Sequence, residues 1–587
     1  MLKLFKRFSK KDVLFIIISI IMIIAQVYLD LKTPDYMSEI TQLVKTQGSQ
    51  MSDIWKNGSM MLVCSLGSLI LTVITGYLVA NVAANLSKNI RKEIFEKVES
   101  LGLHEVKEFS TSSLITRTTN DISQIQSFVA MGLQVLVKAP ITAIWGIRKI
   151  LNKGWEWSAA TGIAVLVLLI AVALIVVFVL PKFKKIQKLT DKLNGKAREN
   201  ITGIRVVRAF NASKYQEEKF EAVNAELTDT QLFNQKSFAV IQPLMYIVMY
   251  LLTLSIYLIG IKLINDALLT DRIAIFGNMV VFSSYAIQII MSFLMLVIIF
   301  IMLPRAEVSA GRIKEVLETK DSIKDGNKGT SDATEKGTVE FKDVSFKYPD
   351  ASEYLLEKIS FKANKGEIVA FIGSTGSGKS TLVNLIPRFY DATEGEVLVD
   401  GQNVKDYTQA ELRNRMSYIP QKAMLFDGTV KSNIVYGDNG KSKITQGKIE
   451  EALKVAQGEE FVLKMDGKYD ATISQGGTNI SGGQKQRLSI ARAIARNPEI
   501  YIFDDSFSAL DYKTDKILRK ALKEYTKDAT TLIVAQRIGT IMHADKIIVL
   551  DNGKCVGIGT HKELLKNCEV YKEIALSQLT KEELENA

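Results

Sequence analysis

The segment "EIVAFIGSTGSGKST", from Glu367 to Thr381, decides the fold of the second half of the chain. Its apolar start is typical of a buried strand, its middle is a glycine-rich turn, and its end is compatible with a helix. Such a turn between a strand and a helix lets backbone N–H groups point at phosphate oxygens, close to the positive end of the helix. The segment therefore predicts a phosphate-binding loop in an α/β domain.

The residues of this loop have distinct expected roles. Lys379 would reach the terminal phosphates of a nucleotide, and the Ser380 hydroxyl would bind Mg²⁺. The other expected nucleotide-binding residues of the loop are Gly373, Ser374, Thr375, Gly376, Ser377, Gly378 and Thr381.

Two further segments carry groups suited to phosphate chemistry. In "YIFDDSFSALD", from Tyr501 to Asp511, Asp504 ends an apolar strand and is placed to hold Mg²⁺, directly or through water, while Asp505 would face the terminal phosphate. Ser481 and the two glycines after it begin a helix in "ISGGQKQRLSIARAIA", which is a second anion site. One nucleotide does not use both anion sites of one chain, so we expect two chains to close around ATP.

The surrounding sequence fits a mostly parallel sheet in a domain over residues 339–575, with a tail over 576–587. Short β-rich runs alternate with helix-compatible stretches. These runs are "EIVAFIG", "MSYIP", "IYIFD", "TLIVA" and "KIIVLD". A polar segment over 316–338 is expected to be a flexible linker.

Residues 1–315 are predicted to form a six-helix transmembrane domain with cytoplasmic helix extensions. The apolar run from Ile163 to Leu180 is long enough to cross a bilayer once its flanks are counted. Similar runs are Val13–Leu31, Met60–Ala84, Phe128–Leu151, Ala239–Ile264 and Ile273–Leu303. The basic start "MLKLFKRFSKK" resembles a positive-inside flank, so we expect a multi-pass protein of the cell membrane whose N-terminus and nucleotide domain are cytoplasmic.

The net charge and the cysteine content narrow the classes of partner that we expect for this chain. The net charge of +11 is concentrated beside the spans, where it matches anionic lipid headgroups, so membrane lipid is an expected partner and nucleic acid is not. The three cysteines are far apart and have no metal-type spacing.

The inner connections between spans are long, polar and compatible with helices. "SLITRTTND" (113–121) and "GIRVVRAFN" (203–211) lie near the two inner turns. Each is either a solvated loop or a short helix presented to the domain below.

These motifs, in this order, resemble an ATP-binding-cassette (ABC) exporter half-transporter: a helical, exporter-type transmembrane domain fused to an α/β P-loop domain. The resemblance implies ATP and Mg²⁺ as cofactors, Tyr348 stacked on adenine and Gln421 sensing the metal. It also makes the two inner-turn segments coupling regions, and Ser508 to Asp511 the loop after the catalytic strand. The signature motif would consist of Ser481, Gly482, Gly483 and Gln484, with Ile480 where leucine is usual.

Three positions depart from the family pattern. Asp505 replaces the glutamate that polarises the attacking water, Gln536 replaces the switch histidine, and Gln475 replaces a glutamate before the signature. A shorter carboxylate misses the water, which costs on the order of 10² to 10⁴ in rate, about 3 to 5 kcal/mol of barrier. Glutamine donates a hydrogen bond but cannot become cationic. Asp505 and Gln536 are thus the candidate catalytic positions, in degenerate form.

The pattern resembles the degenerate subunit of bacterial heterodimeric multidrug exporters. The expected partner is a second, non-identical half-transporter that carries the glutamate and the histidine, and the expected cargo is hydrophobic or amphipathic. Two alternatives stay open: an active but slow homodimeric exporter of lipids or drugs, and an ATP-binding regulatory subunit that gates a partner or channel.

The spans offer candidate cargo contacts. Lys138, inside the third span, is expected to face a cavity or an opposite charge. Soft and aromatic residues of span six either line an adaptable cavity or simply pack. They are Met279, Met291, Met295, Met302, Phe282, Tyr285 and Phe293.

Overall fold

The computed structural model describes residues 5–46, 48–151, 154–268, 271–327, 336–437 and 443–579. Parts of the expected linker (328–335) and tail (580–587) lie outside these ranges. The chain forms two compact units, one of Met1–Glu99 with Thr111–Thr319 and one of Ser100–Ser110 with Lys320–Ala587. The boundary at Thr319 falls inside the segment expected to be a linker.

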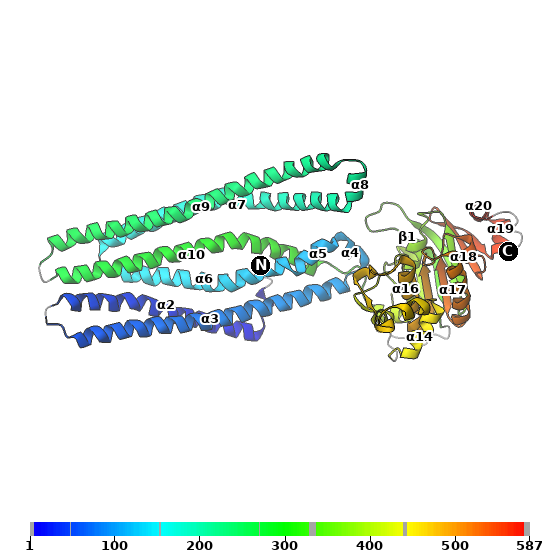
Figure 1. The fold of residues 1–587 in the computed structure, drawn as a ribbon, viewed down its shortest axis with the longest axis horizontal. Helices are drawn as coiled ribbons and strands as arrows, with labels where there is room; N and C mark the ends of the chain where they lie inside the picture. The colour runs from blue at the N-terminus through cyan, green and yellow to red at the C-terminus, as the bar shows by residue number, and fades with distance from the viewer. Residues whose placement is uncertain are drawn as a thin grey trace. The chain divides into compact units, whose positions relative to one another are not determined.

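Long helices make up the first unit (Figure 1). They are α2 (Lys10–Lys45), α3 (Met51–Ser100), α6 (Asn120–Leu151), α7 (Trp155–Thr202), α9 (Ser213–Asp266) and α10 (Arg272–Glu318). Each of the six expected spans lies within one of them. Five of the helical segments are long and apolar enough to cross a membrane, and the described side chains of α7 supply a shorter apolar stretch, Trp155–Ala171.

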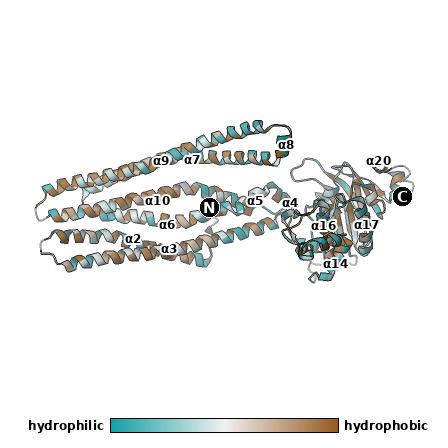
Figure 2. Ribbon diagram, in the orientation of Figure 1, coloured by the Kyte–Doolittle hydropathy of each residue, from teal (hydrophilic) through white to brown (hydrophobic). Residues whose placement is uncertain are grey.

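The helices continue past their apolar parts, as expected from the long inner connections. Figure 2 shows hydrophilic ends on α7 and α9 where they meet at α8 (Ile204–Ala209). The other inner turn carries α4 (Leu103–Glu108) and α5 (Thr111–Thr118). Both turns therefore form short helices and not loops, while α8 is exposed except at Val207, so its presentation to another domain stays a prediction.

The segment "SLITRTTND" lies in α5 and at the start of α6. The side chain of its arginine, Arg117, contacts residues of α10 in the first unit. Buried Arg117 donates a hydrogen bond to the Arg312 carbonyl at 2.8 Å and pairs with Glu315 at 2.8 Å. It is α4, earlier in the chain, that belongs to the second unit. The coupling role expected for this segment stays a prediction; of the two short helices at this turn, only α4 clusters with the second unit.

A six-stranded sheet forms the centre of the second unit, in the order β12-β11-β3-β10-β9-β6. Its strands are β3 (Ile368–Gly373), β6 (Met416–Ile419), β9 (Ile500–Asp504), β10 (Thr530–Val534), β11 (Lys546–Asp551) and β12 (Lys554–Gly559). All neighbours pair in parallel except β12, which is antiparallel to β11. The five predicted β-rich runs are the five parallel strands.

The strands are buried on both faces, which explains their continuous apolar sequence. In β3, Val369 and Phe371 pack into one core while Ala370 and Ile372 pack into the other. One core lies toward a second, antiparallel sheet that the sequence did not predict. Its order is β2-β1-β4-β5, from β1 (Val339–Phe346), β2 (Leu356–Ala363), β4 (Glu394–Val399) and β5 (Gln402–Asn403).

Helices cover the other core. Of these, α16 (Gly482–Arg496) and α17 (Tyr512–Tyr525) bear on the site. The helix α11 (Lys379–Asn384), which follows β3, instead packs Leu382 and Val383 into the core beside the antiparallel sheet. The remaining elements are α12 (Gln409–Asn414), β7 (Gly428–Thr429), α13 (Val430–Ile434), α14 (Gln446–Val455), α15 (Glu459–Lys464), η1 (Lys468–Asp470), β8 (Thr472–Ile473), η2 (Gln475–Gly477), α18 (Ile538–Ile541), α19 (His561–Asn567) and α20 (Glu569–Leu576).

Candidate nucleotide site

The glycine-rich loop connects the end of β3 to the start of α11, and its conformation requires glycine. Gly378 has φ of 92°, which L-residues rarely adopt, and a Cβ there would lie 2.6 Å from the Leu356 side chain. A Cβ on Gly373 would lie 2.0 Å from the Leu550 carbonyl oxygen. Only the absence of side chains lets the loop curl against β11 and β2.

Lys379 lies inside the curl of the loop. Its ammonium donates hydrogen bonds to the carbonyl oxygens of Gly373 (2.9 Å) and Ser374 (2.7 Å) and lies 3.3 Å from the Ser377 hydroxyl. Burial lowers the pKa of Lys379, while the nearby Asp505 and Asp504 oppose that shift. An ammonium held by neutral oxygens in a partly buried loop is well placed to gain an anion, and the loop fits a polyphosphate.

Asp504 links the loop to the catalytic strand. Its Oδ1 accepts a hydrogen bond from the Ser380 hydroxyl at 2.7 Å, and its Oδ2 accepts one from the Tyr418 hydroxyl at 2.8 Å. A hydroxyl beside a carboxylate is the hard oxygen set that Mg²⁺ prefers, so Ser380 and Asp504 fit the metal of a magnesium nucleotide. Mg²⁺ bound there would supply charge neutralisation at the phosphates.

Sequence reasoning missed Tyr418. It lies in β6, the parallel neighbour of β9, and its hydroxyl reaches the end of that strand. Burial, with Asp504 adding to it, raises the pKa of the Tyr418 phenol well above its usual range, so the group stays a hydrogen-bond donor. The signal in the sequence was a tyrosine three residues before Gln421, in the β-rich run "MSYIP".

Asp505 is held by two amides. Its Oδ2 accepts hydrogen bonds from Gln421 Nε2 at 3.0 Å and from Gln536 Nε2 at 2.8 Å. We call Gln421, Asp505 and Gln536 the amide clamp. Burial raises the pKa of Asp505, the Gln421 bond opposes that shift, and the charge of Asp504 adds to it. Two of the three departures from the family pattern, Asp505 and Gln536, therefore meet at one oxygen atom.

The backbone of Asp505 is also fixed. Its φ of 47° is left-handed, its N–H donates to the Val534 carbonyl at 3.0 Å, and its carbonyl accepts from the Ser508 hydroxyl at 2.9 Å. A carboxylate on so constrained a backbone has little freedom to move toward a distant water.

Tyr348 lies against the helix that follows the loop. Its hydroxyl is 3.0 Å from the Thr381 hydroxyl, and its ring meets the Tyr390 ring edge-on, with centroids 5.3 Å apart. Tyr390 in turn accepts a hydrogen bond from Lys107 of α4 at 3.3 Å. Tyr390 thus contacts both Tyr348, the residue expected to stack on adenine, and α4, a helix from the first half of the chain.

The signature residues begin α16 and cap it. The Gln484 N–H donates to the Ser481 hydroxyl at 3.3 Å, and the Ser481 N–H donates to Gln484 Oε1 at 2.9 Å. Gly482 and Gly483 form the first turn of the helix. No hydrogen bond within the described ranges joins these four residues to the phosphate loop. The signature residues therefore lie apart from the other predicted nucleotide-binding residues.

Gln475 is exposed at the start of η2, and nothing in the structure explains its departure from the pattern.

Comparison with known proteins follows the same division of the chain. Residues 16–293 match the ABC transporter transmembrane region, and residues 356–508 match the ABC transporter family. An ABC transporter ATP-binding protein of Mycobacterium tuberculosis is 38% identical over 521 residues, which span 88% of this chain and 87% of that protein. A putative multidrug export ATP-binding/permease protein of Bacillus subtilis is 32% identical over 503 residues, 84% of this chain and 83% of its own length.

The fold has a close counterpart among solved structures. A bacterial Atm1-family ABC exporter with ATP bound superposes with a TM-score of 0.80 at 22% identity, over 97% of this chain and 98% of the other. The fold and the site define an ATP-binding transport protein of the exporter type, with a transmembrane domain fused to its ATPase domain. The chain belongs to the ABC transporter family.

The contact between Tyr418 and Asp504 yields a test of the metal site. Tyr418→Phe removes a donor that orients a metal-binding carboxylate, and losing such a support typically weakens a metal site by about 10- to 100-fold. We expect the Mg²⁺ concentration that half-saturates nucleotide binding to rise by about tenfold or more. Binding of a fluorescent ATP analogue, titrated with Mg²⁺, measures this; unchanged binding in excess EDTA is the control, and an unchanged Mg²⁺ midpoint contradicts the role.

The raised pKa of Asp505 yields a test by pH. Because the pKa of Asp505 is higher in the folded chain, its ionisation costs stability. This cost is absent below the pKa of the unfolded chain, grows as pH rises from there to the raised pKa, and is fully present above it. Asp505→Asn removes that cost, so the variant should melt above the parent at pH 7 to 8. The difference should vanish by about pH 4, where aspartate is protonated in the unfolded chain.

Asp511→Asn is the matched control for that experiment. The Asp511 carboxylate caps α17 by accepting from the Thr514 N–H, and this bond lowers its pKa. Removing its charge should give no gain at neutral pH. Equal gains from both substitutions would mean that net charge, not burial at Asp505, sets the effect.

Proposed function

We propose that this chain is one subunit of a heterodimeric, ATP-driven exporter of hydrophobic or amphipathic compounds. Its own site binds ATP and Mg²⁺ and hydrolyses ATP weakly, while Ser481 to Gln484 complete a competent site on a non-identical partner. The partner carries a glutamate and a histidine where this chain has Asp505 and Gln536. The nucleotide domain faces the cytoplasm.

One observation carries the proposal: the amide clamp. A catalytic glutamate must extend past the strand to reach a water near the terminal phosphate. Asp505 is shorter by about one C–C bond, ~1.5 Å. Its outer oxygen is also engaged by Gln421 and Gln536, at 3.0 and 2.8 Å, so the base would first have to give up two hydrogen bonds.

Gln536 deepens the same defect. A histidine at that position can carry a positive charge toward the terminal phosphate, whereas a glutamine amide stays neutral. In this chain the amide donates to Asp505 instead. Asp505, at the position of the proton acceptor, and Gln536, at the position of the phosphate-stabilising residue, thus hydrogen-bond to each other.

The binding parts have no such defect. Lys379 and Ser380 occupy the positions that phosphates and Mg²⁺ require, and we infer that Tyr348 stacks on adenine and Gln421 senses the metal. The cargo class is supported by the similarity to the Bacillus subtilis protein named a putative multidrug export ATP-binding/permease protein. The helical unit, with its five apolar membrane-length helices, is suited to such cargo.

Restoring the two family residues should restore hydrolysis. The purified chain alone should have a low ATPase rate, and Asp505→Glu with Gln536→His should raise it about a hundredfold or more. Asp505→Asn is the matched control and should leave the low rate nearly unchanged. Binding of a fluorescent ATP analogue should persist in all three and be lost in Lys379→Ala.

The outcome that contradicts the weak site is equally clear. If the parent chain alone is as fast as the restored variant and Asp505→Asn abolishes the rate, then the shorter carboxylate is an adequate base. The slow or active homodimer would then be the better description.

The partner can be sought directly. A tagged chain purified from its native membrane should carry a second ABC half-transporter with glutamate and histidine at the two positions. In vesicles that hold the pair, ATP-dependent uptake of a fluorescent amphiphile should stop when the partner's glutamate is replaced by glutamine. Unchanged flux in that variant would favour the regulatory alternative, and recovery of this chain alone would exclude the heterodimer.

A further inference from the structure

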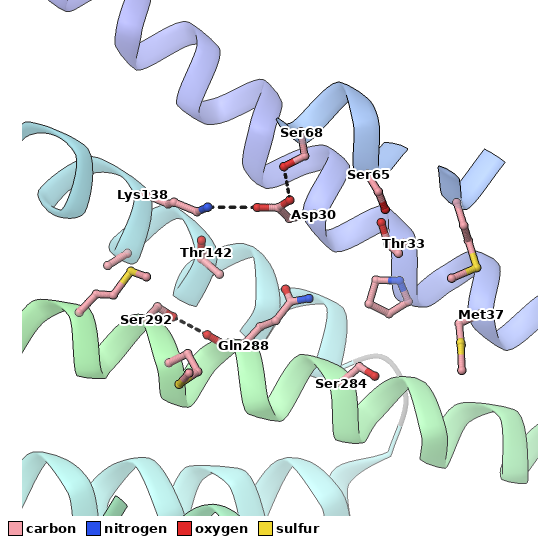
Figure 3. Close-up of a pocket in the computed structure, with 15 residues that line it drawn as sticks. Asp30, Thr33, Met37, Ser65, Ser68, Lys138, Thr142, Ser284, Gln288 and Ser292 are labelled. Carbon is pink, nitrogen blue, oxygen red and sulfur yellow. Dashed lines mark hydrogen bonds and ion pairs between the residues drawn. The ribbon is translucent and has the colours of Figure 1, made fainter. Parts of the chain in front are cut away.

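A polar pocket of about 550 Å³ lies among the apolar helices of the first unit (Figure 3). Residues of α2, α3, α6 and α10 line it, all from the parts of these helices that the sequence marks as spans or their outer continuations. We call this the ionic pocket, because one acidic and one basic side chain face each other in it. Its volume lies in the range of ordinary ligand sites.

The two charges are Asp30 and Lys138. Asp30 Oδ2 lies 3.2 Å from Lys138 Nζ, and the Ser68 hydroxyl donates to Asp30 Oδ1 at 2.5 Å. Each of the two charged side chains is 31% exposed. The pair is therefore reachable from the pocket and not sealed between helices. This also answers the expectation for Lys138, which has both a cavity and an opposite charge.

Unused hydrogen-bonding groups lie beside the pair. Thr142 is more than nine-tenths buried, and its hydroxyl has no hydrogen-bond partner within the described residues. Gln288 is half-buried, and its buried side-chain oxygen also has no hydrogen-bond partner within the described residues. Figure 3 shows both side chains at the pocket, one from α6 and one from α10. Buried polar groups are normally satisfied, so two orphans in one pocket indicate a polar ligand.

Soft apolar groups complete the lining. Met37, Met61, Met291 and Met295 come from three helices and can repack around a flexible chain. Of the soft and aromatic residues of span six named as candidate cargo contacts, Met291 and Met295 line this pocket. Met279, Phe282 and Tyr285 are instead buried in the packed core of the unit, with Phe293 against it; Met302 packs in a smaller cluster.

We propose that the ionic pocket binds the head group of a zwitterionic amphiphile, one that carries an ammonium group and a phosphate or carboxylate. The ammonium pairs with Asp30, the anionic group pairs with Lys138, and Thr142 and Gln288 bond to the remaining polar atoms. The methionines contact the apolar chain. The inference rests on the proposed export of amphipathic compounds and names the class within it.

Charge balance selects the zwitterion. A ligand with one charge takes one member of the Asp30–Lys138 pair and leaves the other unpaired in an apolar surrounding, which is costly. A ligand with both charges exchanges one ion pair for two and leaves no charge alone. The pocket therefore discriminates against purely cationic and purely anionic amphiphiles with the same chain.

The test uses the full-length chain in nanodiscs of phosphatidylglycerol, without ATP. Four fluorescent probes carry apolar chains of the same length. They are a lysophosphatidylethanolamine, its N-acetylated anionic form, an alkylamine and an alkyl α-amino acid. Fluorescence anisotropy measures binding of each. We expect the two zwitterions to bind at least tenfold more tightly than the singly charged probes. Binding of only one zwitterion identifies phosphate or carboxylate as the anionic group.

Variants separate recognition from folding. Thr142→Val keeps the shape and charge of the pocket and should weaken binding of the two zwitterionic probes about fivefold or more. Asp30→Asn should abolish the preference for the zwitterionic probes over the anionic probe. Lys149→Gln is the matched control, because Lys149 and Asp35 form an ion pair (2.5 Å) between the same helices outside this pocket. It should leave binding unchanged.

Three results overturn the proposal: equal binding of all four probes, loss of binding in Lys149→Gln as large as in Thr142→Val, or an unchanged preference in Asp30→Asn. The last would mean that the ion pair only holds α2 against α6. None of these readouts depends on hydrolysis or on a partner, so their failure is distinguishable from failure of the weak-site proposal, which the ATPase variants decide.

Discussion

The parallel register of four neighbouring strands, β3, β10, β9 and β6, positions the phosphate loop and the side chains around Asp504 and Asp505. Val534 of β10 is aligned with Phe371 of β3 on one side and with Asp504 of β9 on the other, and Ile419 of β6 is aligned with Phe503. Parallel strands with this alignment end at one edge of the sheet. The phosphate loop, Gln536, the two aspartates and Gln421 therefore emerge together. A slip of one residue in any strand would turn its last side chain to the other face.

The amide clamp shows how binding and hydrolysis can be separated on one scaffold. Under the proposed function, the phosphate and metal contacts would come from the loop and from Asp504, whose partners here are two hydroxyls. The hydrolytic position comes from the next residue, whose partners are two neutral amides. Because these functions are carried by adjacent residues, one can be weakened while the strand, the loop and the metal ligands stay as they are.

The sequence was most informative where local pattern and geometry coincide. A strand, a glycine turn and a lysine specify the phosphate loop almost by themselves, and the five parallel strands are recognisable as short apolar runs. Contacts between distant segments were out of reach. The hydrogen bond of Tyr418 to Asp504 depends on which strands are neighbours, and the pairing of Lys138 with Asp30 depends on how helices pack. The antiparallel sheet was missed because its strands alternate polar and apolar residues too irregularly to stand out, as the bulges in β1 indicate.

The small helix α4 bears on how the protein is made. Ser100–Ser110 is synthesised well before the domain with which it clusters, and it must wait, attached to two long helices, until Tyr390 and Asp350 exist to receive Lys107 and His104. An isolated nucleotide domain that begins at Lys320 would lack this piece of its own surface, next to the tyrosine that supports Tyr348. Studies of nucleotide affinity on such a fragment would therefore describe a protein that lacks part of the support behind Tyr348, the residue proposed to stack on adenine.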